Sequence, residues 1–316
     1  MAARTRYAPD RGLTARMTAT MFLLGLVFVA FIAAIIGIGA ATHASDGVIV
    51  LFAVVLGGGV AIGSLFYSDK IALRTARAVE VSPQQAPQLH GIVDRVCALA
   101  DMPKPRVAIA NTPMPNAFAT GRNADKAVLC VTTSLMNKLT PEELEGVIAH
   151  ELSHVAHKDV QVMTIASFLA IIAALLIRIS FYGELFGGRR GGNNSGGYAA
   201  IMFLVLMAVS IIVYAISFLL IRLLSRYREL AADRSGALLT GQPSALKSAL
   251  IKVSGDMARI PTRDLRTAEP LNAFFFAPAM HMTGGTSLST IFSTHPSLER
   301  RLAELDKVQR QLSQAG

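Results

Sequence analysis

Four long apolar runs limit the folds that this chain of 316 residues can adopt. They cover about residues 18–41, 48–67, 160–181 and 199–224. A transmembrane helix needs about 20 apolar residues, so each run is long enough to cross a bilayer. Only 16% of the residues are charged, whereas soluble domains usually contain about 25%. The sequence therefore predicts an integral membrane protein with two transmembrane helical hairpins.

The first apolar run follows a basic segment, as the apolar part of a signal peptide does. Four arginines precede it, at positions 4, 6, 11 and 16. The apolar core of a signal peptide has only about 7–15 residues, and this run is longer. Thr42-His43-Ala44 resembles a weak cleavage site, so cleavage is the alternative. The length favours an uncleaved anchor.

Basic residues on the outer flanks of the first hairpin indicate its orientation. Lys70, Arg74 and Arg77 follow the second run, and the four arginines precede the first. Cytoplasmic flanks of membrane helices are enriched in Lys and Arg. We therefore expect a multi-pass protein of the cytoplasmic (inner) membrane with both termini and the soluble segments in the cytoplasm. The glycine-rich loop 183–197 would then be extracytoplasmic despite its two arginines; a partly inserted second hairpin is the alternative.

The net charge of +9 does not by itself indicate a nucleic-acid-binding protein. The basic residues are scattered or lie beside the apolar runs, so we expect no nucleic-acid partner and a lipid bilayer instead. A basic rim suits anionic lipid headgroups. Cys97 and Cys130 lie in apolar stretches without metal-ligand spacing. This predicts reduced core residues in a cytosolic compartment, with a disulfide as the alternative.

The apolar runs divide the chain into four parts. Residues 1–75 contain the N-terminal segment and the first hairpin, and residues 160–224 contain the second hairpin. Residues 76–159 and 225–316 are less apolar, and we expect them to form the two parts of one soluble domain. The expected fold class is α+β and mostly α-helical.

The first soluble part contains patterns of both helix and strand. Residues 87–100 have the pattern of an amphipathic helix, and residues 106–110 and 127–133 are rich in strand-forming residues. The segment 113–121 between the strands is either a proline-rich loop or an edge segment that pairs with an extended peptide. Its spacing alone favours the loop.

The second soluble part is patterned at both ends. Residues 243–257 and about 298–312 are expected to form helices. Residues 261–294 between them are poorly patterned, and their position suggests a flap over a site.

His150-Glu151-Leu152-Ser153-His154 is an H-E-x-x-H sequence near the end of the first soluble part. Residues i and i+4 of a helix lie on one face, so both imidazoles can reach one metal ion. Glu151 follows the first histidine, beside the position of a metal-bound water. This pattern is the helical half of a zinc hydrolase site, in which the glutamate is the general base.

The residues around this motif predict the helix that it needs. Thr140, Pro141 and Glu143 have the pattern of an N-cap, a proline in the first turn and the glutamate of a capping box. Apolar residues then recur at helical spacing and should face a core. They are Leu144, Ile148, Leu152 and Val155.

A catalytic zinc ion usually has three protein ligands and a water, so a third ligand must come from elsewhere. The glycine and histidine that metzincins carry after the motif are absent, because His157 and Val160 occupy those positions. Glu229 is the best candidate, since Asp233 one turn later can accept the free N–H of a ligand histidine. In the alternatives, Glu229 is a solvated charge beside Arg226 and Arg228, or His157 binds the metal.

Four motifs occur in the order seen in HtpX-type membrane zinc endopeptidases, which the chain resembles over nearly its whole length. They are His150–His154, Glu229-x-x-x-Asp233, Pro115-Asn116-Ala117-Phe118 and Thr294-His295-Pro296. The resemblance implies a zincin-like (gluzincin) catalytic domain that faces the cytoplasm and serves membrane-protein quality control. It implies one Zn²⁺ per chain, bound by His150, His154 and Glu229, with Glu151 as base.

The resemblance also implies roles for residues outside the ligand set. Asp233 would support a ligand histidine, and Asn116 and Ala117 would lie on an edge segment that binds the substrate backbone. Under the resemblance, the segment 113–121 is therefore a substrate-binding edge segment and not the loop that its spacing alone favours. His295 would stand near the zinc and could stabilise the oxyanion. His281 matches no motif and is expected to be an ordinary loop histidine.

The predicted reaction is hydrolysis of peptide bonds in misfolded or damaged membrane proteins or other unfolded polypeptides. Zinc would activate a water, and Glu151 would take its proton and deliver it to the leaving amine. One alternative is a CaaX-type prenyl-protein endopeptidase, although those chains are longer and have more spans. The other is a non-catalytic membrane scaffold with a vestigial site. The patterns specify neither a cleavage preference nor an oligomeric state.

Overall fold

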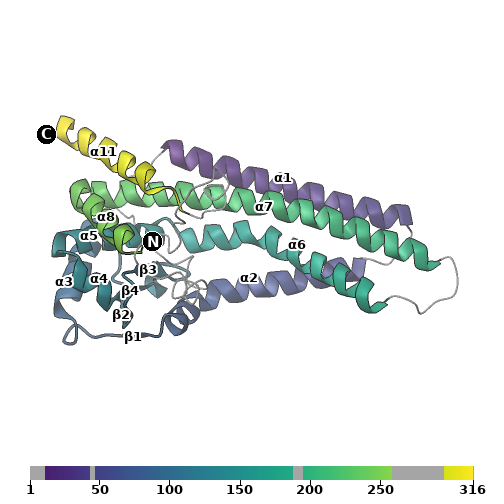
Figure 1. The fold of residues 1–316 in the computed structure, drawn as a ribbon, viewed down its shortest axis with the longest axis horizontal. Coiled ribbons are helices and arrows are strands. Elements are labelled where there is room, and N and C mark those ends of the chain that lie inside the picture. The colour runs from purple at the N-terminus through teal and green to yellow at the C-terminus, as the bar shows by residue number, and fades with distance from the viewer. Residues whose placement is uncertain (1–10, 43–46, 188–194, 258–294, 316) are drawn as a thin grey trace. The chain divides into compact units, whose positions relative to one another are not determined.

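The protein is described by a computed structural model, which is mostly helical with one small sheet (Figure 1). The described residues are 11–42, 47–187, 195–257 and 295–315. Several predicted features lie outside them. These are the link at 43–46, part of the glycine-rich loop, and the poorly patterned segment with His281 and Thr294.

The chain divides into two compact units. The second unit consists of residues 15–64 and 162–224, and the first contains residues 65–161 and 225–316 together with residues 1–14. All four boundaries between the units fall inside helices, so the chain passes from one unit to the other within helices.

The second unit is built from four long helices that run side by side (Figure 1). They belong to α1 (Arg11–Thr42), α2 (Gly47–Thr75), α6 (Asp159–Gly187) and α7 (Ser195–Thr240). Within the described residues, three stretches are long and apolar enough to cross a membrane, namely Thr14–Ile36, Asp159–Phe181 and Leu204–Thr240. The prediction of a mostly helical membrane protein is confirmed, and the count of two spanning hairpins stays a prediction.

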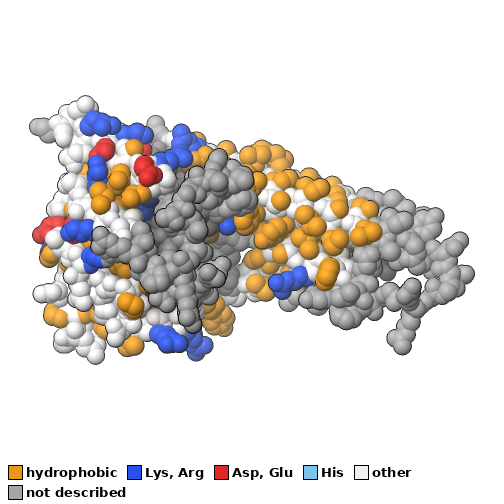
Figure 2. Space-filling view, viewed as in Figure 1, with side chains coloured by type: hydrophobic (Ala, Val, Ile, Leu, Met, Phe, Trp, Pro, Cys, Tyr) orange, Lys and Arg blue, Asp and Glu red, His pale blue; other side chains and the backbone are white. Residues whose placement is uncertain are grey.

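The helices of the second unit pack through a narrow core and expose the rest of their apolar surface. Phe31, Ile172 and Leu176 are buried, whereas Phe22 and Val29 on α1 are largely exposed. Apolar side chains are frequent on the described part of this surface (Figure 2). Exposed apolar side chains all along a helix are suited to lipid, because no water is present there to penalise them.

Small residues let two of these helices approach closely, as the Gly57-Gly58-Gly59 sequence predicts. A Cβ on Gly57 would lie 3.0 Å from Cγ1 of Ile172 on α6, whereas a Cβ on Gly59 would meet nothing within 4 Å. The first of these glycines is therefore the one at which α2 and α6 approach most closely.

The first unit contains a four-stranded sheet in the order β1-β2-β4-β3. The strands are β1 (Ala78–Glu80), β2 (Arg106–Ala110), β3 (Ala117–Thr120) and β4 (Val128–Thr132). β2 and β4 are parallel, and β1 and β3 pair antiparallel with them at the two edges. The two predicted strands are present, the segment 113–121 contains the edge strand β3, and the short strand β1 was not predicted.

Helices surround this sheet and form the core of the first unit. They are α3 (Pro87–Ala100), α4 (Thr133–Lys138), α5 (Pro141–Ala156), α8 (Pro243–Met257) and α11 (Leu298–Ala315), with a 3₁₀ turn, η1, at Ala124–Lys126. The predicted inward residues Leu144, Ile148, Leu152 and Val155 of α5 are all buried in one cluster with α3, β4 and α8. Cys97 and Cys130 are buried and free, as predicted.

Helix α7 joins two segments that the sequence predicts separately, the fourth apolar run and the helical spacing of Glu229 and Asp233. The apolar run ends near residue 224, but the helix continues without a break to Thr240. Its last four turns lie in the first unit and include Glu229 and Asp233. Polar residues follow Leu224, and two of them, Glu229 and Asp233, are buried in the first unit.

Candidate metal centre and active site

Helix α5 is fixed at its start by the predicted capping box. The Thr140 hydroxyl accepts a hydrogen bond from the Glu143 N–H at 3.3 Å, and the Glu143 carboxylate accepts one from the Thr140 N–H at 2.9 Å. The same carboxylate accepts hydrogen bonds from Ser248 at 2.6 Å and Lys252 at 2.8 Å, both on α8. The N-terminus of the motif helix is therefore tied to a neighbouring helix.

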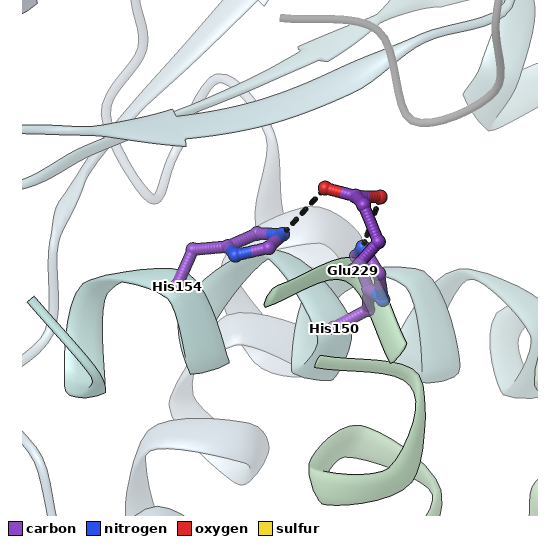
Figure 3. A group of neighbouring side chains, drawn as sticks. All are labelled: His150, His154 and Glu229. Carbon is purple, nitrogen blue, oxygen red and sulfur yellow. Dashed lines mark ion pairs between the residues drawn. The ribbon is translucent and has the colours of Figure 1, made fainter. Parts of the chain in front are cut away.

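His150, His154 and Glu229 point toward one another from α5 and α7 (Figure 3). Glu229 Oε2 lies 3.7 Å from His150 Nε2, and Glu229 Oε1 lies 3.5 Å from His154 Nε2. One ligand atom from each of the three residues lies within 4.8 Å of the others. All three predicted metal ligands are thus brought together by two helices.

The chemistry of the donor set fits a zinc ion. Each histidine Nε2 faces its own oxygen of Glu229, at 3.7 Å for His150 and 3.5 Å for His154. Two imidazoles and one carboxylate are the ligands of several zinc hydrolases, which keep the fourth position for water. His157 is the C-cap residue of α5 and is not a member of this group.

Asp233 supports His150, as predicted from its position one turn after Glu229. Its Oδ1 lies 3.0 Å from His150 Nδ1. Arg301, on the first turn of α11, donates two hydrogen bonds to the same carboxylate, at 2.7 and 2.6 Å. All three side chains are buried. The paired arginine keeps Asp233 ionised, so that the aspartate can hold the ring of His150 with Nε2 toward the metal.

Asp159 supports His154 in the same way, although sequence reasoning did not identify it. Its Oδ2 lies 2.5 Å from His154 Nδ1 and 2.9 Å from the guanidinium of Arg228. Arg228 therefore has a specific partner. The signal that could have found Asp159 is weak: an acid five residues after the second histidine, at the first residue of α6.

The general-base candidate Glu151 is held by the edge strand. The N–H of Ala119 on β3 donates to Glu151 Oε2 at 3.2 Å. Glu151 is buried and its Oε1 lies 4.0 Å from His150 Nε2. This contact fixes the carboxylate beside the ligand cluster.

The predicted substrate-binding residues lie on or beside β3, but their backbones face opposite ways. The Asn116 carbonyl accepts a hydrogen bond from Thr132 N–H at 2.9 Å, and its own N–H donates to the Thr132 hydroxyl at 2.9 Å. Backbone groups alternate in direction along an antiparallel strand. Those of Ala117 and Ala119 therefore point away from β4, as the Ala119–Glu151 contact shows.

His295 is buried beside the third ligand, close to the predicted position. Its Nδ1 lies 3.1 Å from Glu229 Oε2, and Arg301 Nη1 lies 3.9 Å from the same oxygen. The histidine thus contacts the ligand Glu229 directly, and stabilisation of an oxyanion would fall to its other nitrogen, Nε2.

Burial and the paired carboxylates set the protonation of the motif residues. Burial lowers the pKa of His150 despite the neighbouring Asp233, which favours the neutral, metal-binding imidazole. Burial also opposes the charged form of His154, but the hydrogen bond to Asp159 outweighs it and raises that pKa. Burial raises the pKa of Glu151 to about 8, so this carboxyl has a proton affinity suited to a base near neutral pH.

Comparison with known proteins agrees with this geometry. Residues 83–309 match the profile of Peptidase family M48. The chain belongs to peptidase family M48. It is 55% identical over 312 residues to Protease HtpX homolog 1 of Streptomyces coelicolor, covering 99% of this chain and 98% of the relative. It is also 50% identical over 311 residues to Protease HtpX homolog of Moorella thermoacetica, covering 98% of this chain and 99% of the relative.

Among solved structures, the fold of this M48 peptidase is similar to that of Ste24p of S. mikatae. The TM-score is 0.50 at 17% identity, and the match covers 94% of this chain and 67% of that chain. The relatives, the metal-binding geometry and the apolar helices together show an HtpX-type, membrane-bound metalloendopeptidase.

Proposed function

We propose that this M48 peptidase is a zinc-dependent endopeptidase that cleaves misfolded or damaged membrane proteins at the cytoplasmic side of the inner membrane. The observation that carries the proposal is the convergence of His150, His154 and Glu229 within 4.8 Å, with Glu151 beside them. A scaffold with a vestigial site would have no need for this buried set of ligands and supports.

A zinc ion held by these three residues supplies Lewis acidity, which lowers the pKa of a water and polarises a peptide carbonyl. The protein provides the rest of the chemistry. Glu151, held by the Ala119 N–H, takes a proton from the attacking water and returns it to the leaving amine. His295 Nε2 is the proposed donor to the oxyanion. Removing one such donor from other hydrolases costs about 10²–10³ in rate.

The edge of β3 that faces away from β4 is proposed to bind the peptide, which requires the buried Ala117 to become accessible. An extended peptide that adds a strand there would use the outward backbone groups of Ala117. Backbone pairing does not depend on the substrate's side chains, which suits an enzyme that accepts many unfolded sequences. The backbone of Asn116, which is bonded to Thr132 on β4, would fix the start of this strand.

The cytoplasmic orientation is supported by the distribution of charge. Lys70, Arg74 and Arg77 follow an apolar run and lie in the same unit as the metal ligands. Because cytoplasmic flanks are enriched in Lys and Arg, this unit is proposed to face the cytoplasm.

The first test compares wild type with Glu151→Gln in detergent, by zinc content and by cleavage of an unfolded membrane protein. We expect equal zinc in both proteins and cleavage only by the wild type, with a loss of about 10²-fold or more. Normal cleavage by the variant would refute the role of Glu151. Zinc in both with cleavage in neither would support the scaffold, and a requirement for a prenylated C-terminal peptide would support the CaaX-type alternative.

The second test concerns the third ligand. Glu229→Ala is expected to lose zinc, because two histidines alone do not form a stable site. A full complement of zinc in the purified variant would point to another ligand such as His157.

A further inference from the structure

The end of helix α2 carries basic and aromatic residues on one exposed face. Phe66, Tyr67 and Ile71 have 51%, 55% and 52% of their surface exposed, and Lys70 and Arg74 are exposed between and after them. Positions 67, 70, 71 and 74 share one side of a helix. We call Phe66, Tyr67, Lys70, Ile71 and Arg74 together the basic–aromatic surface.

The opposite face of the same turns is fixed in the core of the first unit. Ala72 is buried in a cluster with Ala108, Phe118 and Val128 on three strands of the sheet. The basic–aromatic surface is therefore carried by a rigid helix that is packed against the catalytic unit, rather than by a free tail.

Neighbouring acids do not neutralise this surface. Asp69 is the sole acid among residues 65–75, and it accepts a hydrogen bond from Arg106. Arg106 also binds Glu80 at 2.6 Å, at the end of the adjacent strand β1. Both acids thus have a partner, and within the part of the chain that the structure describes no ion pair involves Lys70 or Arg74. Arg77 adds a third exposed cation just beyond the helix.

Two cation–π contacts bind the cations to the aromatic rings. Lys70 Nζ lies 5.5 Å from the centre of the Tyr67 ring, and Arg122 Cζ lies 4.9 Å from that of Phe66. Arg122 is itself fixed, because its carbonyl accepts a hydrogen bond from Gln161 at 2.5 Å. A fourth cation is thereby held next to the basic–aromatic surface before any ligand arrives.

We propose that this surface binds the phosphate groups of anionic phospholipids, with its rings and Ile71 inserted among the first carbons of the acyl chains. Basic clusters directly after an apolar helix favour anionic headgroups, and aromatic rings favour the same interfacial depth. The surface follows the apolar part of α2 on the same helix. Exposed Phe, Tyr and Ile interspersed with the cations fit a lipid better than an acidic polypeptide or a nucleic acid, both of which are polar.

The test measures lipid binding by native mass spectrometry of the full-length protein in a zwitterionic detergent. Dioleoyl-phosphatidylglycerol and dioleoyl-phosphatidylcholine are titrated against wild type and Lys70→Gln/Arg74→Gln. Each basic residue near an anionic lipid surface contributes about fivefold in affinity, so the double variant should bind phosphatidylglycerol about 30-fold more weakly. Its binding of phosphatidylcholine should be unchanged.

The matched control is Lys307→Gln/Arg310→Gln, which removes two exposed cations from α11 at similar spacing. It should bind both lipids as the wild type does. Lys70→Arg/Arg74→Lys, which keeps both positive charges, should bind phosphatidylglycerol as the wild type does. Equal affinity of the wild type for both lipids would overturn the proposal. An equal loss of phosphatidylglycerol binding in the α11 control would also overturn it. So would displacement of the lipid by a poly-glutamate peptide or an RNA oligomer.

Discussion

Gly236 on α7 packs directly against the backbone of His150 on α5. A Cβ at position 236 would lie 2.9 Å from the His150 nitrogen and 3.1 Å from its Cα. Because α7 also carries Glu229, the distance between the third ligand and the H-E-x-x-H motif depends on this close approach of the two helices.

Gly236→Ala should therefore disrupt the metal centre without changing a ligand. Overpacking a tight contact costs about 1–3 kcal/mol, and the backbone must move where the ligands converge. We expect weaker zinc binding and a lower melting temperature, measured by chelator competition and thermal unfolding. Gly255→Ala, where an added Cβ meets nothing within 4 Å, is the control; it should bind zinc as the wild type does and should not lower the melting temperature.

Asp159→Asn should weaken zinc binding although Asp159 is not a ligand. The change removes the negative charge that orients His154 and pairs with Arg228. Loss of such a supporting carboxylate typically costs about 10–100-fold in metal affinity. A competition titration with a chelator measures the zinc affinity. The control is Asp125→Asn on the exposed turn η1, which makes the same substitution away from the metal site. Unaltered affinity in Asp159→Asn would show that the contact is not needed to orient His154.

Ala119→Pro tests whether the edge strand positions the general base. Proline removes the N–H that donates to Glu151, and proline is tolerated at an edge position whose N–H points away from the sheet. General-base catalysis by a positioned side chain contributes about 10²–10⁴ to the rate. For Ala119→Pro we expect the rate to fall about tenfold while zinc is retained. Ala119→Gly keeps the N–H and should retain most activity. Equal turnover in both variants would argue that Glu151 is held by other contacts.

Glu143→Gln should destabilise the first unit in a pH-dependent way. Burial opposes ionisation of Glu143, but Lys252, Ser248 and the Thr140 N–H outweigh it and lower its pKa. A carboxyl with a lowered folded pKa contributes stability above its ordinary value of about 4.3, and this contribution is lost as the pH falls through the folded pKa.

The expected loss for Glu143→Gln at pH 7 is about 1–3 kcal/mol, and it should shrink below about pH 4. Thermal unfolding in detergent at the two pH values measures it. Glu142→Gln, at the exposed neighbouring position, should change stability much less. A difference that is the same at both pH values would mean that the charge of Glu143 is not what stabilises the helix start.

Cys97 and Cys130 should be unreactive while the protein is folded. Burial raises their pKa values to about 11 and about 12. At pH 8 about one Cys97 in a thousand would then be a thiolate, against about a quarter for an unperturbed cysteine. Labelling with iodoacetamide should be slow in the native protein and should modify both residues after denaturation. Fast labelling of either residue in the folded protein would contradict its burial.

The sequence by itself determined the features that depend on helical periodicity. The capping box at Thr140 and Glu143, the two histidines one turn apart, and Glu229 with Asp233 one turn later all follow from spacing along one segment. The lengths of the apolar runs likewise predicted the long helices. In each case the interacting residues are at most a few positions apart, so one segment contains the whole pattern.

Only the tertiary structure decided which distant residues complete the site. Arg301 binds Asp233 from 68 residues away, and Asp159, Arg228 and Gly236 have roles that arise where α5, α6 and α7 meet. The direction in which the Ala119 N–H points follows from the position of β3 at the edge of the sheet. These contacts join separate segments, and the packing of the core, rather than any local pattern, determines which segments become neighbours.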